Sequence, residues 1–291
     1  MEKRTRNLLA GGIGLILIFS LIGFFASGKA SELDLRKGDV AVVSLDGSIT
    51  SSSSGFGSSS ITPSKVRDLN ERALNSGADA IIYEINSGGG AVVASKDVKR
   101  EIESVGVPTV CRLRDVAASG GYLISLGCNR TVADSASITG SIGVRSSFLE
   151  FSGLLNRLGV EYVNITSGKL KGVGSPYRNI TPEERRLLKQ KSEMIHREFI
   201  NLVEKERNLS QSEVEKISTG EIFLGSEAKK LELVDKLGGR QQAVEEAENL
   251  TGHDLKVKQV DEGPDFSFLD LMGIESFLSS GANPPLRAEI G

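Results

Sequence analysis

The chain has 291 residues and a formal net charge of −3, so it lacks the basic surface field that nucleic-acid binding requires. Aromatic residues make up 5% of the sequence and Trp is absent, which leaves no stacking platform for bases. The two Cys and two His lie far apart and do not form a tetrahedral metal site. We therefore expect no nucleic-acid partner, no metal and no cofactor.

The N-terminus has the features of a membrane anchor over residues 1–30. Lys3, Arg4 and Arg6 precede an apolar stretch, Leu8 to Ala26, whose only polar side chain is Ser20. As a helix this stretch would span about 28 Å, close to the ~30 Å hydrocarbon core of a bilayer. The positive-inside bias places the N-terminus in the cytoplasm and the rest of the chain outside the cell membrane. A cleaved signal peptide is the alternative, but the apolar run is longer than is usual for one, so we favour an uncleaved single-pass anchor.

The folded body is predicted over residues 31–260, beginning with a polar linker and a buried strand over 39–45. Residues 50–60 are almost all Ser and Gly, which favours a solvated loop, with a mobile flap beside a site as the alternative. Thr62 and Pro63 then have the N-cap and first-turn pattern of a helix. The next predicted elements are strands over 80–85, 108–113 and 131–133 and helices over 92–105 and 119–126.

Helices dominate the remainder of the body. Thr181-Pro-Glu-Glu184 is a capping-box-like start for a long helix that is expected to run to Arg207. Shorter helices are predicted over 210–218, 226–231 and 241–250. Strands that alternate with helices predict an α/β fold with a largely parallel sheet. Residues 261–291 are predicted to hold a short amphipathic helix, interpreted as a docking element rather than a membrane helix, and a disordered tail.

The two cysteines can be interpreted in two ways. A compartment outside the cytoplasm permits disulfides. Cys111 lies in a predicted strand and Cys128 just past a predicted helix. They can pair, but two buried free thiols are the interpretation that we favour.

Ser119 is the first candidate for chemistry. Two alanines precede it and two glycines follow, so the backbone can bend sharply and a substrate carbonyl can approach closely. A helix that begins here offers free N–H groups to a developing oxyanion. The alternative is that Ser119 is only an N-cap in a tightly packed turn, and this motif alone favours that alternative.

Three other segments are candidates for a role beside Ser119. Asn86-Ser-Gly-Gly-Gly90 lacks the pattern of a phosphate-binding loop and better fits a backbone donor or a rail for an extended peptide. Neither histidine has a motif-like context, so a base would more readily be Lys169 or Lys171, which the sequence alone does not separate. A lysine acts as a base only when uncharged, which requires burial. Ser226-Glu-Ala-Lys229 matches Ser-x-x-Lys formally but lacks partner motifs, so Ser226 is interpreted as a helix N-cap.

Taken together, these segments resemble the signal peptide peptidase SppA family of membrane-anchored serine proteases. Five motifs in order carry the resemblance, from about residue 40 to 240. They are Asn86-Ser-Gly-Gly-Gly90, Ala117-Ala-Ser-Gly-Gly-Tyr122, Thr139-Gly-Ser-Ile-Gly-Val144, Ser167-Gly-Lys-Leu-Lys171 with Ser175-Pro176, and Ala228-Lys-Lys-Leu-Glu-Leu-Val-Asp235 with Gly238-Gly239. Gly88 stands where the family usually has proline, which loosens the loop.

The resemblance implies a crotonase-like, Clp-protease-like α/β fold built from repeated β-β-α units. It implies a nucleophile, Ser119, with Lys171 as general base and Ser141 as the residue that orients the lysine. It places the oxyanion hole at Gly89 or Gly90 and the N–H of Gly120.

The same resemblance implies substrates and an assembly. The substrates would be extended apolar peptides such as signal-peptide remnants. The assembly would be a homo-oligomeric ring whose sites are shared between protomers. A catalytically silent anchored scaffold of the same fold is the alternative function. A crotonase-like acyl-CoA enzyme is disfavoured by the anchor, because acyl-CoA pools are cytosolic.

Overall fold

The computed structural model describes residues 38–52 and 60–260. The predicted anchor over 1–30, most of the Ser/Gly-rich loop and the segment 261–291 lie outside the described residues. Within the described ranges, no helix is both long enough and apolar enough to cross a membrane.

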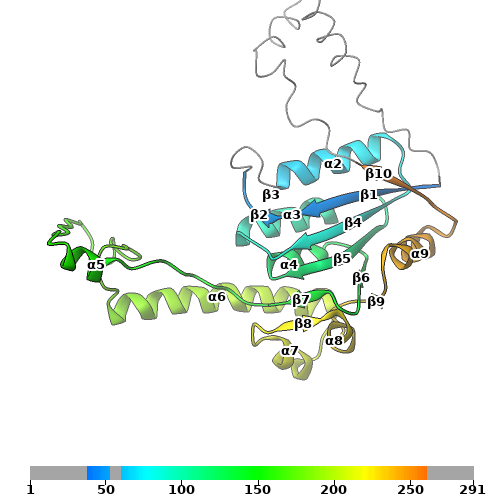
Figure 1. The fold of residues 1–291 in the computed structure, drawn as a ribbon. Coiled ribbons are helices and arrows are strands. Elements are labelled where there is room, and N and C mark those ends of the chain that lie inside the picture. The colour runs from blue at the N-terminus through cyan, green and yellow to red at the C-terminus, as the bar shows by residue number, and fades with distance from the viewer. Residues whose placement is uncertain (1–37, 53–59, 261–291) are drawn as a thin grey trace, which may run out of the picture. The chain divides into compact units, whose positions relative to one another are not determined.

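A central sheet has the strand order β10-β1-β4-β5-β6-β9, with every neighbouring pair parallel (Figure 1). These strands are β1 (Asp39–Asp46), β4 (Ala80–Ser87), β5 (Thr109–Ala118), β6 (Arg130–Ala133), β9 (Lys236–Leu237) and β10 (Lys256–Val260). The inner strands β1 and β4 are nearly continuous apolar runs, as is typical of a parallel sheet covered on both faces. The predicted α/β class with a largely parallel sheet is confirmed.

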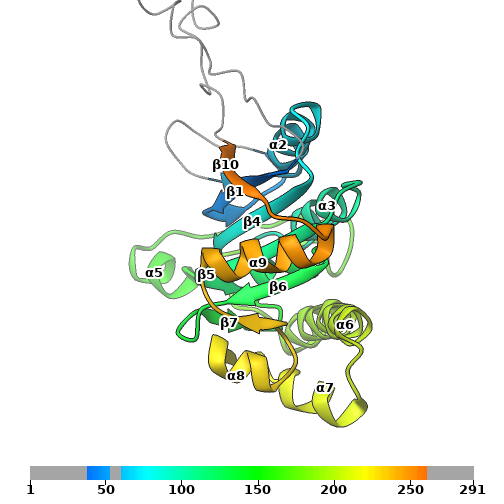
Figure 2. The same cartoon turned by 90° about the vertical axis from the view of Figure 1, so that its right-hand side faces the viewer.

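Alternate side chains of the strands face different helices. The covering helices are α2 (Pro63–Asn75), α3 (Val92–Glu103), α4 (Gly120–Ser125) and α9 (Arg240–Thr251). Ala80 and Ile82 of β4 belong to the core cluster that includes Ala243 and Ala247 of α9. Tyr83 faces the other way, and its hydroxyl donates to Asn70 of α2 over 2.6 Å. Figure 2 shows α9 lying across β5 and β6 on one side of the sheet.

A buried ion-pair network joins α9 to the sheet. The carboxylate of Glu84 is 2% exposed and accepts hydrogen bonds from Arg112 and Arg240, each over 2.7 Å. Burial alone would raise the pKa of Glu84, but the hydrogen bonds from Arg240 and Arg112 outweigh it and hold the pKa below its ordinary value.

Most helices begin and end near their predicted bounds. The Thr62 hydroxyl caps α2 by accepting from the Lys65 N–H, and α6 (Pro182–Arg207) begins with the predicted capping box of Thr181. The remaining helices are α5 (Ser152–Arg157), which was not predicted, α7 (Gln211–Ile217) and α8 (Gly225–Lys230).

The main difference from the prediction lies in β5. The strand was expected to end at Leu113 but continues to Ala118, directly before Ser119. Its charged middle conceals the continuation in the sequence, because Arg112 and Arg114 are half-buried and pair with Glu84 of β4 and Asp46 of β1.

Six strands of the described residues were not predicted from the sequence: β9 and β10 of the central sheet, and four short strands. The short strands are β2 (Ser48–Ile49), β3 (Ser60–Ile61), β7 (Ile138–Gly140) and β8 (Ile222–Leu224). The end of β5 pairs with β7, which in turn pairs antiparallel with β8.

Residues 145–180, with α5, form a segment that we call the arm. Figure 1 shows the arm running along α6 from the side of β7 and ending, with α5, beside the N-terminal end of α6 and away from the sheet.

The cysteines form a disulfide, so the favoured interpretation of two free thiols is wrong. Cys111 lies in β5 and Cys128 follows α4, with their Cα atoms 5.7 Å apart. The chain reverses at Ser119 and α4 packs back along β5, which brings the two residues together. That reversal cannot be seen in the spacing of the two cysteines.

Candidate active site

Ser119 forms the junction between β5 and α4. It adopts φ 54° and ψ −121°, a conformation that strains any residue except glycine and is typical of a nucleophile held on a sharp strand-to-helix turn. Its N–H donates to the Gly140 carbonyl over 2.8 Å, which fixes the turn to β7. Ser119 occupies the N-cap position, but its side chain makes no capping hydrogen bond. The capping role weighed from the sequence is therefore absent, and the hydroxyl is available for other chemistry.

The glycine loop after β4 packs against this turn. Gly89 has φ +96°, and a Cβ placed there would lie 2.6 Å from the Gly120 nitrogen. The loop continues beside β2, where the Ile49 N–H donates to the Gly89 carbonyl and the Ala91 N–H donates to the Ile49 carbonyl. In a parallel bridge of this kind, Gly90 directs its own N–H away from β2.

Gly90 and Gly120 line the same cavity as Ser119. The first N–H groups of α4, including that of Gly120, have no acceptor within the helix. The arrangement can therefore present backbone donors and a hydroxyl to one carbonyl group.

The turn after β7 forms a further wall. Gly140 and Ser141 have φ values of 74° and 51°, and the Ser141 N–H donates to the Glu221 carbonyl over 2.7 Å. The imidazole of His196 on α6 donates from Nε2 to the Ile142 carbonyl over 2.9 Å. His196 thus ties the turn that carries Ser141 to α6, a role that its sequence context did not indicate.

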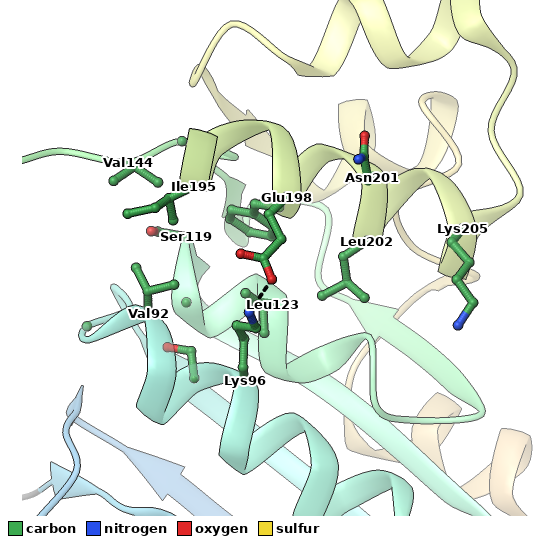
Figure 3. Close-up of a pocket in the computed structure, with 15 residues that line it drawn as sticks. Val92, Lys96, Ser119, Leu123, Val144, Ile195, Glu198, Asn201, Leu202 and Lys205 are labelled. Atoms are coloured by element: carbon green, nitrogen blue, oxygen red, sulfur yellow. Dashed lines mark hydrogen bonds and ion pairs between the residues drawn. The ribbon is translucent and has the colours of Figure 1, made fainter. Parts of the chain in front are cut away.

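A cavity of about 270 Å³ begins at Ser119 and extends between α3, α4 and α6 (Figure 3). Its walls are mostly apolar, and an ion pair between Lys96 and Glu198 crosses it. The lining side chains from these helices and the adjacent turn include Val92, Leu123, Val144, Ile195, Phe199 and Leu202. This cavity cannot be predicted from sequence motifs, because α6 contributes much of its wall from a distant part of the chain.

Lys171 lies elsewhere, exposed on the arm, and is not among the residues that line the cavity. Its loop is held to the first turn of α6 by Arg178, which donates to the Gly172 carbonyl over 2.8 Å and to Glu184 over 2.9 Å. The arm is attached at Glu184, and the first residue of α6 that lines the cavity is Ile195, about 16 Å further along the helix.

The structure therefore brings Ser119, Gly90 and Gly120 together in the wall of the cavity. Gly89 packs against Gly120, but its N–H already donates to the Ser87 Oγ over 3.1 Å, and Ser141 follows Gly140, whose carbonyl accepts from the Ser119 N–H. Lys171 of the same chain stays apart.

The two lysines of the loop have different surroundings. Lys169 forms an ion pair of 2.6 Å with Glu183. Across the described ranges, Lys171 forms no ion pair and its side chain makes no hydrogen bond. The described residues also contain no group of three or more His, Cys, Asp or Glu that could hold a metal ion.

The fold is similar to that of a solved protease. A membrane-bound stomatin-specific protease, 1510-N, in complex with a substrate peptide matches with a TM-score of 0.51 and 16% identity, over 84% of this chain and 100% of that one. A structure of another mutant of that protease matches with the same TM-score over 78% of this chain. These neighbours support the α/β fold expected from the sequence.

Residues 101–254, more than half of the chain, match peptidase family S49. The chain belongs to this family, and the resemblance to signal peptide peptidase SppA is confirmed.

Curated relatives agree with this assignment. A putative protease of Methanocaldococcus jannaschii is 34% identical over 62% of this chain and 59% of its own length. A putative signal peptide peptidase SppA of Enterococcus faecium is 34% identical over 57% of this chain and 49% of its own length. Protease 4 of Haemophilus influenzae is 31% identical over 72% of this chain and 34% of its own length. The chain spans about half the length of the curated relatives that it matches.

Proposed function

We propose that this protein is a serine endopeptidase with Ser119 as nucleophile and Lys171 of a neighbouring copy as general base. The observation that carries the proposal is the strained Ser119 turn, which opens onto an apolar cavity beside the backbone of Gly90 and Gly120. Membership of a peptidase family supports the same activity.

The proposed reaction has two stages. The uncharged Nζ of Lys171 accepts the proton of the Ser119 hydroxyl as Oγ bonds to the peptide carbonyl carbon, and backbone N–H groups hold the resulting oxyanion. The carbon–nitrogen bond then breaks, and the lysine returns its proton to the leaving amine. Water attacks the acyl-enzyme with the lysine again as base, which releases the new carboxyl end and restores Ser119.

The arm supports a lysine supplied by a second copy. Contiguous exposed apolar residues mark protein interaction surfaces, and the arm carries many of them. They are Phe148, Leu149, Phe151, Leu154, Leu158, Val160, Tyr162, Val163 and Ile165. Burial disfavours the protonated form of a lysine, so a neighbour that covers the arm would also favour the basic form of Lys171. We infer a homo-oligomeric ring with sites shared between protomers.

The substrates that we propose are extended apolar peptides, such as signal-peptide remnants near a membrane. Two observations support this class of substrate. The loop that carries Gly90 already pairs with extended backbone at Ile49, and the cavity beside Ser119 has mostly apolar walls. The predicted anchor over 1–30, with its N-terminus in the cytoplasm and the body outside the membrane, would keep the site near such peptides.

Active-site labelling with a fluorophosphonate probe tests the proposal. We expect the full chain to be labelled at Ser119 and Ser119→Ala to remain unlabelled. Lys171→Ala is expected to lose peptide cleavage, while Lys169→Ala keeps it as the matched control. A Lys171→Ala protein that retains substantial cleavage would exclude Lys171 as the base. A chain that neither reacts with the probe nor cleaves apolar peptides would favour the catalytically silent scaffold.

Mixing the two inactive variants tests the shared site. Ser119→Ala and Lys171→Ala chains that co-assemble are expected to recover part of the activity, because some sites would combine an intact serine with an intact lysine. Confirmed co-assembly without recovery would argue against sharing.

A further inference from the structure

The cavity beside Ser119 is crossed by two opposite charges. Lys96 of α3 and Glu198 of α6 form an ion pair, and both side chains line the cavity. Figure 3 shows the pair between Ser119 and the distal end of the cavity, which is marked by Lys205. On the Ser119 side the wall is mostly apolar, and the hydroxyl of Ser95, which also lines it, donates to the Ala91 carbonyl. A side chain that enters from the serine therefore meets mainly hydrocarbon first and the ion pair next.

The position of this pair distinguishes it from other contacts between the same helices. Lys99 of α3 pairs with Glu206 of α6 over 3.2 Å, but neither residue lines the cavity. The Lys99–Glu206 pair therefore holds α3 against α6 without facing a bound side chain. Lys96 is 32% exposed and Glu198 59%, so both are accessible to a group that enters the cavity.

We propose that the Lys96–Glu198 pair determines which side chain the site accepts at the residue whose carbonyl Ser119 attacks. The two charges neutralise each other, which leaves a short apolar subsite that accepts uncharged aliphatic side chains and disfavours charged ones. The pair also limits the depth of the subsite, because a longer side chain has to displace it. This inference rests on the proposed peptidase function and assigns the specificity of that site.

Removing one partner at a time makes opposite predictions. Glu198→Ala leaves the Lys96 cation facing the subsite, and a charge in a partly shielded cavity favours a substrate of opposite sign. We expect the ratio of kcat/KM for a glutamate substrate to that for a leucine substrate to rise about tenfold. Lys96→Ala leaves the Glu198 carboxylate and is expected to raise the corresponding ratio for a lysine substrate by a similar factor.

Two further proteins separate the charge effect from damage to the fold. The exchanged pair, Lys96→Glu with Glu198→Lys, keeps a neutral subsite and is expected to retain the leucine preference. Glu206→Ala breaks the other contact between α3 and α6 and is expected to leave all the substrate ratios unchanged. Thermal melting of each variant checks that the fold is intact.

The experiment uses the full chain and peptide coumarin amides that differ only in the residue before the scissile bond, leucine, glutamate or lysine. The inference is overturned if both single variants cleave the leucine peptide but their glutamate-to-leucine and lysine-to-leucine ratios of kcat/KM change less than twofold. That result leaves the proposed function intact. The same single substitutions in a Ser119→Ala background are tested for binding of fluorescent peptides with the same three residues.

The binding measurement does not depend on catalysis. If opposite charge preferences appear in binding while no form cleaves peptides, the subsite stands and the peptidase proposal fails. If neither binding nor cleavage shows opposite preferences, the inference is overturned.

Discussion

Removing the disulfide between Cys111 and Cys128 is expected to destabilise the body of the protein by about 3 kcal/mol. The bond joins residues separated by 17 positions, and closing a loop of this length restricts the unfolded chain by about that amount at 25 °C. For a body of this size, 1 kcal/mol corresponds to roughly 2–4 °C, so the melting temperature should fall by about 6–12 °C. The closed loop contains Ser119, so labelling of the serine by a fluorophosphonate should also slow on warming.

Thermal unfolding followed by circular dichroism measures the effect in two ways. The Cys111→Ala, Cys128→Ala protein lacks both thiols, while reduced wild-type protein keeps the sulfur atoms and loses only the bond. Because Cys111 is fully buried, the double variant loses packing contacts in addition to the disulfide. The reduced protein keeps those contacts, so its change in melting temperature measures the effect of the disulfide alone. A shift of less than about 2 °C in both proteins would refute the loop-entropy reasoning. Alkylation that finds free thiols in the unreduced chain would refute the bond itself.

Three other changes test the geometry of the site. Gly89→Ala should lower the free energy of unfolding by about 2–5 kcal/mol, because alanine is strained at a positive φ and its Cβ would lie 2.6 Å from the Gly120 nitrogen. A lower melting temperature and slower labelling of Ser119 by the fluorophosphonate would measure this effect. His196→Ala releases the Ile142 carbonyl and should therefore lower the kcat of the full chain by a larger factor than it raises KM. His196→Gln should restore part of the lost kcat, and an unchanged kcat in His196→Ala would contradict this role. Hydrogen bonds from Arg178 lower the pKa of Glu184 to about 2, so its anchoring of the arm should persist from neutral pH to about pH 4 and weaken as pH falls toward 2. Amide hydrogen exchange of the arm should become faster as pH falls through this range. In Glu184→Gln the arm should exchange faster already at pH 7 and should not show this dependence on the carboxyl group.

The sequence predicted the elements whose signals are local. The Thr181 capping box, the Pro63 helix start and the apolar runs of β1 and β4 depend on neighbouring residues, and each appears where it was expected. The small-residue turn at Ser119 was also visible, because alanine and glycine are needed where backbones approach closely.

The parts that the sequence did not predict depend on contacts between distant segments. The hydrogen bond from His196 joins α6 to a turn 54 residues earlier, and no periodicity encodes such a pairing. The ion pair between Lys96 and Glu198 spans 102 residues, so each side chain looks like an ordinary surface charge in the sequence. The catalytic assignment of Lys171 came from a resemblance, and it stays a prediction because the single chain leaves this lysine on the arm.

The outward position of the arm has a consequence for kinetics. If Lys171 serves the serine of another copy, a newly made chain is inert until it meets a second one. Specific activity would then rise with total protein and fall on dilution, although no chain loses its fold. Such a chain needs no inhibitory propeptide, since the cell could set the amount of peptidase activity through the local density of subunits.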